Sequence, residues 1–169
     1  MVFIQQAQPE HVKGIARVCT EGYWATYDEM YSAEYINAVI KEFYNEQRIL
    51  EEVESSSREW GGYFVALDNG EVVGAGGGGM ISEKAGEIFV LYLDPDRLGE
   101  GIGTKLLEAI TRQQKEEFGA QEQWVSVAKG NEKGIPFYEA REFICRSERP
   151  VYRSNADDKI ISLRYWRKL

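Results

Sequence analysis

A buried strand that leads directly into a glycine-rich loop and a helix constrains this chain most. The segment Glu87–Leu93 is almost continuously apolar, as in a strand buried on both faces of a sheet, and Asp94-Pro95-Asp96 ends it. The loop Leu98-Gly99-Glu100-Gly101-Ile102-Gly103 follows, and a helical pattern then continues to Gly119. Glycines let the backbone approach an anion, and a helix start presents unpaired N–H groups. The arrangement predicts a binding site for a diphosphate.

The spacing of the glycines separates this loop from two common phosphate loops. A Walker loop requires Gly-x-x-x-x-Gly-Lys-Ser/Thr, which the sequence from Gly99 to Lys105 does not supply. The dinucleotide pattern Gly-x-Gly-x-x-Gly fails as well, because Thr104, Lys105 and Leu106 follow Gly103. A nucleoside triphosphatase and a Rossmann fold are therefore disfavoured. On the bare pattern, a purely structural tight turn is as good an interpretation as a phosphate site.

The rest of the chain alternates between strand and helix patterns, which predicts a mixed α/β fold. Strands are expected at residues 2–7, 63–67, 71–79, 124–128, 143–145 and 160–166. Helices are expected after Pro9, in two pieces between residues 32 and 57, and from about Gly134 to Tyr138. Residues 68–70 predict a hairpin turn, residues 76–79 a bulge or close backbone approach, and residues 154–159 a polar turn.

Length and composition predict one domain that spans residues 1–169. The apolar content of 43% is enough for one core, and no internal repeat or Pro/Ser-rich linker interrupts the chain. No apolar run approaches the ~18 residues of a membrane span, and the first residues lack the pattern of a signal peptide. We therefore expect a cytoplasmic protein with no membrane partner.

Charge and the rare residue types narrow the function further. The net charge of −8 argues against a nucleic-acid binder and suits a cationic or neutral substrate. Cys19 and Cys145 lack metal-type spacing, which predicts buried free thiols and no metal site. His11, the single histidine, begins a helix and is expected to be solvated.

Two motifs, in this order, resemble those of the GNAT superfamily of N-acetyltransferases. Leu91-Tyr92-Leu93-Asp94-Pro95 and the glycine loop behind it are similar to the family's strand end and its Arg/Gln-x-x-Gly-x-Gly/Ala motif. The segment from Asn131 to Glu139, Asn-Glu-Lys-Gly-Ile-Pro-Phe-Tyr-Glu, is similar to Asn-x-x-Ala-x-x-Phe-Tyr-Glu. The resemblance implies a single domain with a central, mostly antiparallel, twisted sheet of about six to seven strands. It also implies a splayed parallel pair at the coenzyme A (CoA) site and about four to five flanking helices.

Two residues depart from the family pattern. Leu98 stands at the Arg/Gln position, with Arg97 one place early, so one side-chain contact to the diphosphate is expected to be lost or moved. Backbone amides are still expected to bind. Glu142 stands where the family has a glycine, and a glutamate at positive φ is strained.

The resemblance assigns acetyl-CoA to groups of both motifs. The amide of about Leu91 is the expected oxyanion donor. Asn131 is expected to contact the coenzyme, although its side chain can equally cap the following helix. The full set of expected coenzyme-binding residues is Leu91, Tyr92, Leu93, Gly99, Glu100, Gly101, Ile102, Gly103, Thr104 and Asn131.

Tyr138 and Glu87 are the candidate catalytic residues. Tyr138 matches a family tyrosine near the coenzyme sulfur, where a phenol can donate a proton to a thiolate; alternatively, its ring packs on the sheet. Glu87 lies fourteen residues before Gly101, the offset of the catalytic glutamate in the histone-acetylating branch, which implies a base acting through water. Alternatively, Glu87 is a solvated carboxylate at a strand start. Ser126 stands where the ribosomal-protein-acetylating branch of the superfamily carries a glutamate base, so that alternative base is absent.

The acceptor side is predicted from aromatic residues near the first two helices. Trp24, Tyr27 and Tyr31 are expected to hold an ammonium group by cation–π contact, with core packing as the alternative. The predicted activity is direct acetyl transfer from acetyl-CoA to a primary amine, most simply of a small molecule. Alternatives are a protein or peptide N-terminus or lysine as acceptor, and a non-catalytic CoA-binding sensor. The family resemblance also implies a homodimer that forms through the C-terminal strands.

Overall fold

The computed structural model describes residues 1–151 and 160–169, so the predicted polar turn at residues 154–159 lies outside the described residues. In this part of the chain the strands are β1 (Val2–Gln6), β2 (Phe64–Asp68), β3 (Glu71–Met80), β4 (Ala85–Leu93), β5 (Glu122–Ala128), β6 (Ile144–Pro150) and β7 (Ile161–Lys168). The α-helices are α1 (Val12–Tyr27), α2 (Ala33–Phe43), α3 (Glu46–Glu54), α4 (Ile102–Arg112) and α5 (Gly134–Glu139). The 3₁₀ turns η1 (Pro9–His11) and η2 (Pro95–Arg97) and a π-helical turn η3 (Gln113–Glu117) complete the described elements.

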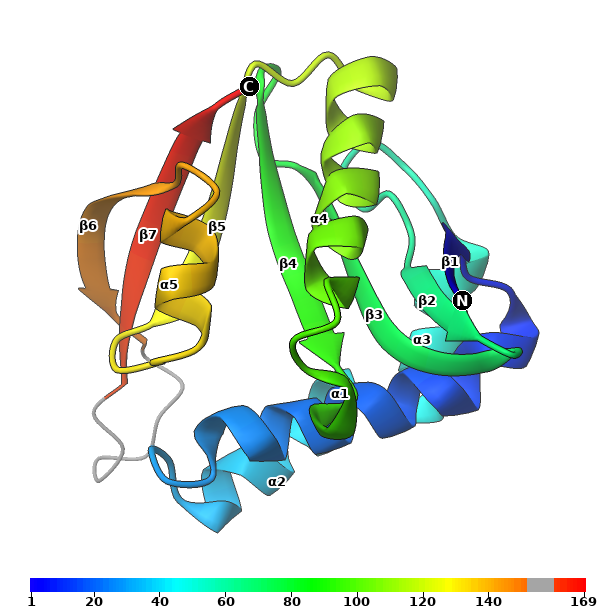
Figure 1. Ribbon diagram of the computed structural model, residues 1–169. Coiled ribbons are helices and arrows are strands. Elements are labelled where there is room, and N and C mark those ends of the chain that lie inside the picture. The colour runs from blue at the N-terminus through cyan, green and yellow to red at the C-terminus, as the bar shows by residue number, and fades with distance from the viewer. Residues whose placement is uncertain (152–159) are drawn as a thin grey trace.

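The described strands form one sheet in the order β1-β2-β3-β4-β5-β7-β6. Neighbouring strands are antiparallel except β4 and β5, which are parallel only from the pair Ala85–Glu122 to the pair Ile88–Val125. Beyond Ile88 the two strands diverge, which Figure 1 shows as a widening gap between their ribbons. The predicted mixed α/β fold, with a mostly antiparallel sheet and a splayed parallel pair, is confirmed.

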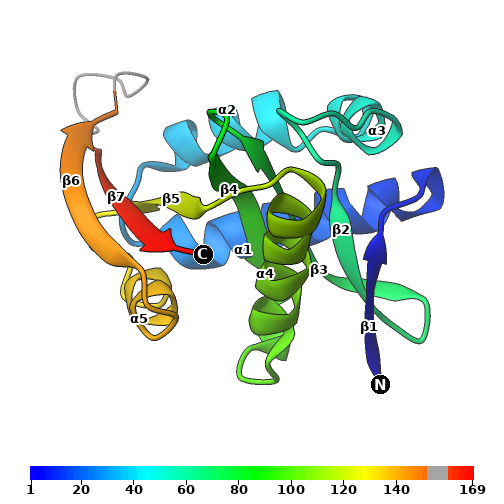
Figure 2. The same cartoon turned by 90° about the horizontal axis from the view of Figure 1, so that it is seen from above.

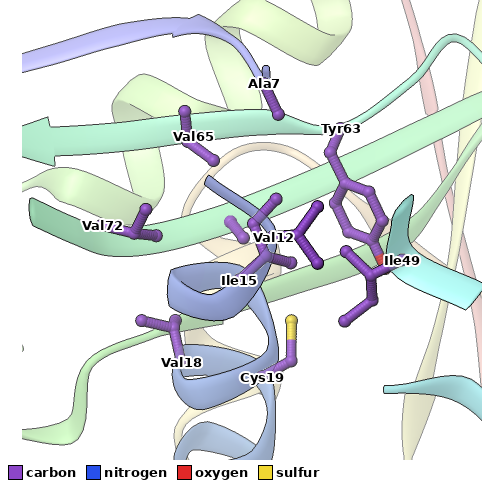
Figure 3. Close-up of a cluster of buried hydrophobic side chains, with 10 residues drawn as sticks. Ala7, Val12, Ile15, Val18, Cys19, Ile49, Tyr63, Val65 and Val72 are labelled. Carbon is purple, nitrogen blue, oxygen red and sulfur yellow. The ribbon is translucent and has the colours of Figure 1, made fainter. Parts of the chain in front are cut away.

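Helices cover both faces of the sheet because neighbouring residues of its strands point to opposite sides. Val65 and Val72 pack with α1 and α3, whereas Ala66 and Val73 pack with α4. Figure 2 shows α4 on one side of the sheet and α2 and α3 on the other. In Figure 3, Tyr63 and Val65 face the helix that carries Ile15 and Cys19. Two apolar layers therefore hold β2, β3 and β4 in place.

Several local predictions are confirmed. The turn between β2 and β3 has Asn69 at φ 51° and Gly70 at φ 81°. The pairing of β3 with β4 shifts between Gly77 and Gly78, and a side chain on Gly78 would lie 2.1 Å from the Glu87 carbonyl oxygen. The predicted close backbone approach is confirmed, and the bulge lies in the same β3–β4 pairing, with its extra residue on β4. Glu142 keeps the positive φ of the family's glycine, at 70°, although a glutamate is strained there.

Three predictions about burial are wrong. β4 is not buried on both faces, since the Phe89 side chain is 46% exposed where β5 no longer covers the strand. His11 is buried rather than solvated, because its Nδ1 accepts a hydrogen bond from the Gln8 amide at 2.9 Å. Cys19 is buried as predicted, but Cys145 is exposed because it lies on the edge strand β6.

Candidate active site

A cavity of about 220 Å³ lies where β4 and β5 diverge. Residues 88–93 of β4 and 125–127 of β5 form its two walls, and residues of α1 and α5 close its sides. Leu98 and Gly103 from the glycine loop and α4 also line it. The cavity therefore joins the predicted diphosphate loop to the predicted catalytic tyrosine.

The glycine loop has the geometry that an anion site requires. Gly99 and Gly101 have φ values of 81° and 79°, a conformation that costs glycine little. No side chain caps the N-terminus of α4, which begins after Gly101. A side chain built on Gly99 or Gly101 would meet no atom within 4 Å. The first amides of α4 therefore face open space, and the loop fits a diphosphate.

The loop's own arginine does not face this space. The Arg97 guanidinium contacts Asp68 at 2.8 Å and Glu100 at 2.8 Å, and these contacts hold the pKa of both carboxyl groups below their usual values. Leu98 instead projects into the cavity lining and is 46% exposed. The family's Arg or Gln contact to the diphosphate is absent at Leu98, and Arg97 does not replace it.

A bulge in β4 presents backbone groups to the cavity. Gly77 pairs with Val90 and Gly78 with Ile88, so Phe89 is an extra residue in β4. The Asp94 amide donates to Val73 of β3 at 2.9 Å. Because amides alternate in direction along a strand, those of Leu91 and Leu93 point away from β3, toward the cavity. The glycines of β3 predicted an irregularity in this pairing, but nothing in the sequence of β4 indicates that Phe89 is the extra residue.

Tyr138 lines the cavity from α5 and is 9% exposed. Its ring meets those of Phe137 and Phe143 edge-on, at centroid distances of 5.0 and 5.4 Å. Burial, with a smaller contribution from the nearby Tyr27 phenol, raises the pKa of Tyr138 above its usual value. The phenol is therefore protonated at neutral pH and is available as a proton donor.

Asn131 has the predicted capping role and also lines the cavity. Its Oδ1 accepts a hydrogen bond from the Gly134 amide at 2.8 Å, which fixes the start of α5 at the predicted residue. Lys133 lines the same wall, and the sequence analysis did not single it out. Its position two residues after Asn131, within the second motif, could have indicated that Lys133 lines the site.

Glu87 lies beside the cavity and does not line it. Its Oε1 forms a salt bridge with Arg164 Nη2 at 2.8 Å, and both side chains are largely buried. Arg164 Nη1 also donates to Ser126 Oγ at 2.8 Å, and Ser126 lines the cavity. The guanidinium stacks over Trp124 at 5.1 Å. Sequence reasoning missed Arg164; an arginine amid the apolar residues of β7 was the available signal.

The predicted acceptor aromatics divide into two groups. Tyr27 lines the cavity, whereas Trp24 and Tyr31 do not. The Tyr27 and Tyr31 rings stack at 4.8 Å with an angle of 11° between them, so Tyr31 supports Tyr27 from behind. The Tyr27 and Tyr92 hydroxyls are hydrogen-bonded, and burial raises the pKa of both phenols.

Residues 1–151 and 160–169 hold neither a metal-type cluster nor a helix suited to cross a membrane. No group of three or more His, Cys, Asp or Glu side chains in these ranges is placed to hold a metal ion. None of the helices described there combines the length and apolar character needed to cross a membrane.

Comparison with known proteins identifies the family. The sequence model of the Acetyltransferase (GNAT) family matches residues 21–143. The chain belongs to the GNAT acetyltransferase family. This confirms the resemblance of the two motifs, and the match spans the glycine loop, the cavity walls and Tyr138.

Two relatives and one solved structure are similar to this chain. The chain is 33% identical over 113 residues to the uncharacterized N-acetyltransferase YuaI of Bacillus subtilis, and the match covers 63% of this chain and 61% of that protein. It is 31% identical to a spermidine N(1)-acetyltransferase of Thermoplasma acidophilum, over 80% of this chain and 83% of that protein. The crystal structure of PaiA N-acetyltransferase from T. acidophilum in complex with CoA superimposes with a TM-score of 0.80 at 24% identity, covering 96% and 98% of the two chains.

Proposed function

We propose that this GNAT protein transfers an acetyl group from acetyl-CoA directly to a primary amine of a small molecule. One observation carries the proposal: a single cavity is lined by the end of the glycine loop, by the free edge of β4 and by Tyr138. These are the three parts that diphosphate binding, thioester binding and proton donation require.

The coenzyme is assigned to the backbone around the cavity. The amides of the loop and the first turn of α4 bind the diphosphate, and the free edge of β4 holds the pantetheine and the thioester. Asn131 contacts the coenzyme from the turn before α5 while it caps that helix. The assigned residues are Leu91, Tyr92, Leu93, Gly99, Glu100, Gly101, Ile102, Gly103, Thr104 and Asn131.

Two groups act on the reacting atoms. The Leu91 amide, directed away from β3, donates a hydrogen bond to the thioester oxygen as negative charge develops on it. Tyr138, whose phenol is protonated at neutral pH and stays so to higher pH because burial raises its pKa, donates a proton to the departing sulfur. In return, the acceptor amine loses a proton to a base.

Glu87 is the proposed base, and Arg164 positions it. The salt bridge at 2.8 Å fixes the carboxylate behind Ser126, which lies on the cavity wall. A proton from the amine must therefore reach Glu87 through water, since its side chain does not line the cavity.

A small cationic amine is the proposed acceptor. The net charge of −8 favours a cation, and Tyr27 presents an aromatic ring at the cavity with Tyr31 stacked behind it and Trp24 on the same helix. The relative from T. acidophilum is named for spermidine acetylation, which supports an aliphatic amine among the candidates.

A panel of acceptors tests the proposed function. CoA release from acetyl-CoA is measured with aliphatic diamines and polyamines, amino acids, an N-terminal peptide and a lysine peptide. We expect turnover with at least one small primary amine and a lower kcat/KM with peptides. Tight CoA binding by calorimetry without turnover on any acceptor would favour a sensor and contradict the proposal.

A further inference from the structure

Two guanidinium groups share a groove between α4, α5 and β7. Arg141 and Arg167 line this groove of about 320 Å³, which begins at Thr104 in the first turn of α4. Arg167 Nη1 donates to the Arg141 carbonyl oxygen at 3.0 Å, so the two side chains are anchored next to each other. Burial lowers the pKa of Arg167; the nearby charge of Glu142 opposes this shift, and that of Arg141 adds to it.

Neither guanidinium is close enough to a carboxylate of the described residues to form a salt bridge. Among residues 1–151 and 160–169, no salt bridge involves Arg141 or Arg167. Arg112 and Lys115 line the groove further along, together with Glu108 and Glu116. Arg141 lies at the Thr104 end of the groove, where its positive charge favours an anion.

Contacts to α4 and α5 hold Arg141 in place. Its Nη2 donates to the Thr104 hydroxyl, and its Nη1 donates to the Phe137 carbonyl oxygen at 2.7 Å. The guanidinium also stacks 3.8 Å above the Phe137 ring, which in turn packs close to Gly103. Its Nε is buried and has no hydrogen-bond partner. The cation is thus preorganised beside the first turn of α4.

Two cations of the neighbouring sequence lie near this turn: Arg97 before the loop, and the exposed Lys105 in the first turn of α4 itself. Arg97 is bound to Asp68 and Glu100, and Glu100 adds a negative charge to the loop. A bound phosphate group would therefore meet amides on one side and a carboxylate nearby. Arg141 is the guanidinium that contacts the first turn of α4 from outside the loop.

We propose that Arg141 binds a phosphate group of CoA and adds a fixed positive charge beside the first turn of α4. The proposal rests on the proposed function, since it takes acetyl-CoA as the ligand of the loop. CoA offers two sources of this chemistry, the diphosphate and the 3′-phosphate. A guanidinium fork binds either of them with charge-assisted hydrogen bonds.

Calorimetry separates the two sources without any measurement of turnover. Dissociation constants of CoA and of 3′-dephospho-CoA are measured for the wild type, Arg141→Gln and Arg141→Lys. Lys115→Gln is the matched control, because it removes one charge from the same groove about three helical turns beyond Thr104. Thermal melts check that each variant folds, and Arg141→Lys keeps the charge if the glutamine variant does not fold.

We expect Arg141→Gln to weaken CoA binding about 10-fold to 100-fold, the range for one charge-assisted contact, with Arg141→Lys in between and Lys115→Gln near the wild type. Equal weakening of both ligands identifies the diphosphate as the partner; weakening confined to CoA identifies the 3′-phosphate. Unchanged binding in the Arg141 variants, or an equal loss in Lys115→Gln, would overturn the proposal. A wild type that binds neither ligand would refute the proposed function as well.

Discussion

Tyr138 is the side chain whose replacement should separate chemistry from binding. Tyr138→Phe removes the proton donor and keeps the ring that packs between Phe137 and Phe143. General acid catalysis contributes roughly 10²-fold or more, so we expect kcat to fall about 100-fold while the dissociation constant of CoA stays within about twofold. Steady-state kinetics and calorimetry measure the two quantities.

Tyr165→Phe is the matched control for this substitution. Tyr165 belongs to the same buried cluster as Tyr138 but does not line the cavity. Its hydroxyl donates to Glu139 instead, at 2.9 Å. The control should keep the wild-type kcat. An equal rate loss in both variants would point to packing rather than proton donation.

Glu87 and Arg164 can be tested as a pair because each holds the other's charge. Removal of either partner leaves a largely buried charge alone, so Glu87→Gln and Arg164→Gln should each cost about 3 kcal/mol of stability. If Glu87 is the base, Glu87→Gln should also lower the rate most at low pH, where the acceptor amine is protonated. Arg164→Gln retains the carboxylate and should show a weaker pH dependence. Identical pH–rate profiles for the two variants would count against a base at Glu87.

The residues of the site differ in whether nearby sequence alone is enough to predict them. Gly99, Gly101 and Tyr138 were predicted because backbone freedom and motif spacing are properties of nearby sequence. Arg164 and Arg141 were missed, since their roles depend on contacts 38 and 37 residues away, with Ser126 and Thr104. No periodicity within a single element reveals such partners.

At the scale of elements, apolar patterns predicted the positions of strands and helices, whereas the splayed β4–β5 pair was implied only by the family resemblance. Apolar patterns located β4 and α4, and the turn at residues 68–70 was fixed by asparagine and glycine at positive φ. The divergence of β4 from β5 depends on pairing between distant segments, which the pattern of β4 cannot encode.

The end of the long helix shows the same limit. The sequence predicted a helix up to Gly119, whereas α4 gives way to the π-helical turn η3. There Gln113 Nε2 donates to Gly61 at 2.8 Å and Gln114 Nε2 to Glu87 at 2.9 Å, both at carbonyl oxygens. Two buried glutamines thus bind backbone groups of other segments, and this tertiary requirement competes with regular helix geometry.

For the whole molecule, the number of buried phenols determines the response to alkaline pH. Tyr27, Tyr44, Tyr92 and Tyr138 all have a pKa raised above the usual value, chiefly because burial disfavours the phenolate. Burial together with the hydrogen bond to Glu139 raises the pKa of Tyr165 to about 12. The folded chain therefore keeps these protons at a pH where the unfolded chain has lost them.

The sign of the effect follows from this difference. A free tyrosine ionises at about pH 10, so the stabilising contribution is complete below that pH and is lost as the pH rises toward 12 and through the folded-state pKa of Tyr165. Each buried phenol that ionises only on unfolding lowers the unfolding free energy by up to about 1.4 kcal/mol per pH unit in this range. Urea unfolding at a series of alkaline pH values, followed by far-UV circular dichroism and tyrosinate absorbance, measures the slope. Tyr165→Phe should make the unfolding free energy fall less steeply with pH, by the contribution of one phenol proton. Tyrosinate absorbance that rises before the chain unfolds would contradict the prediction.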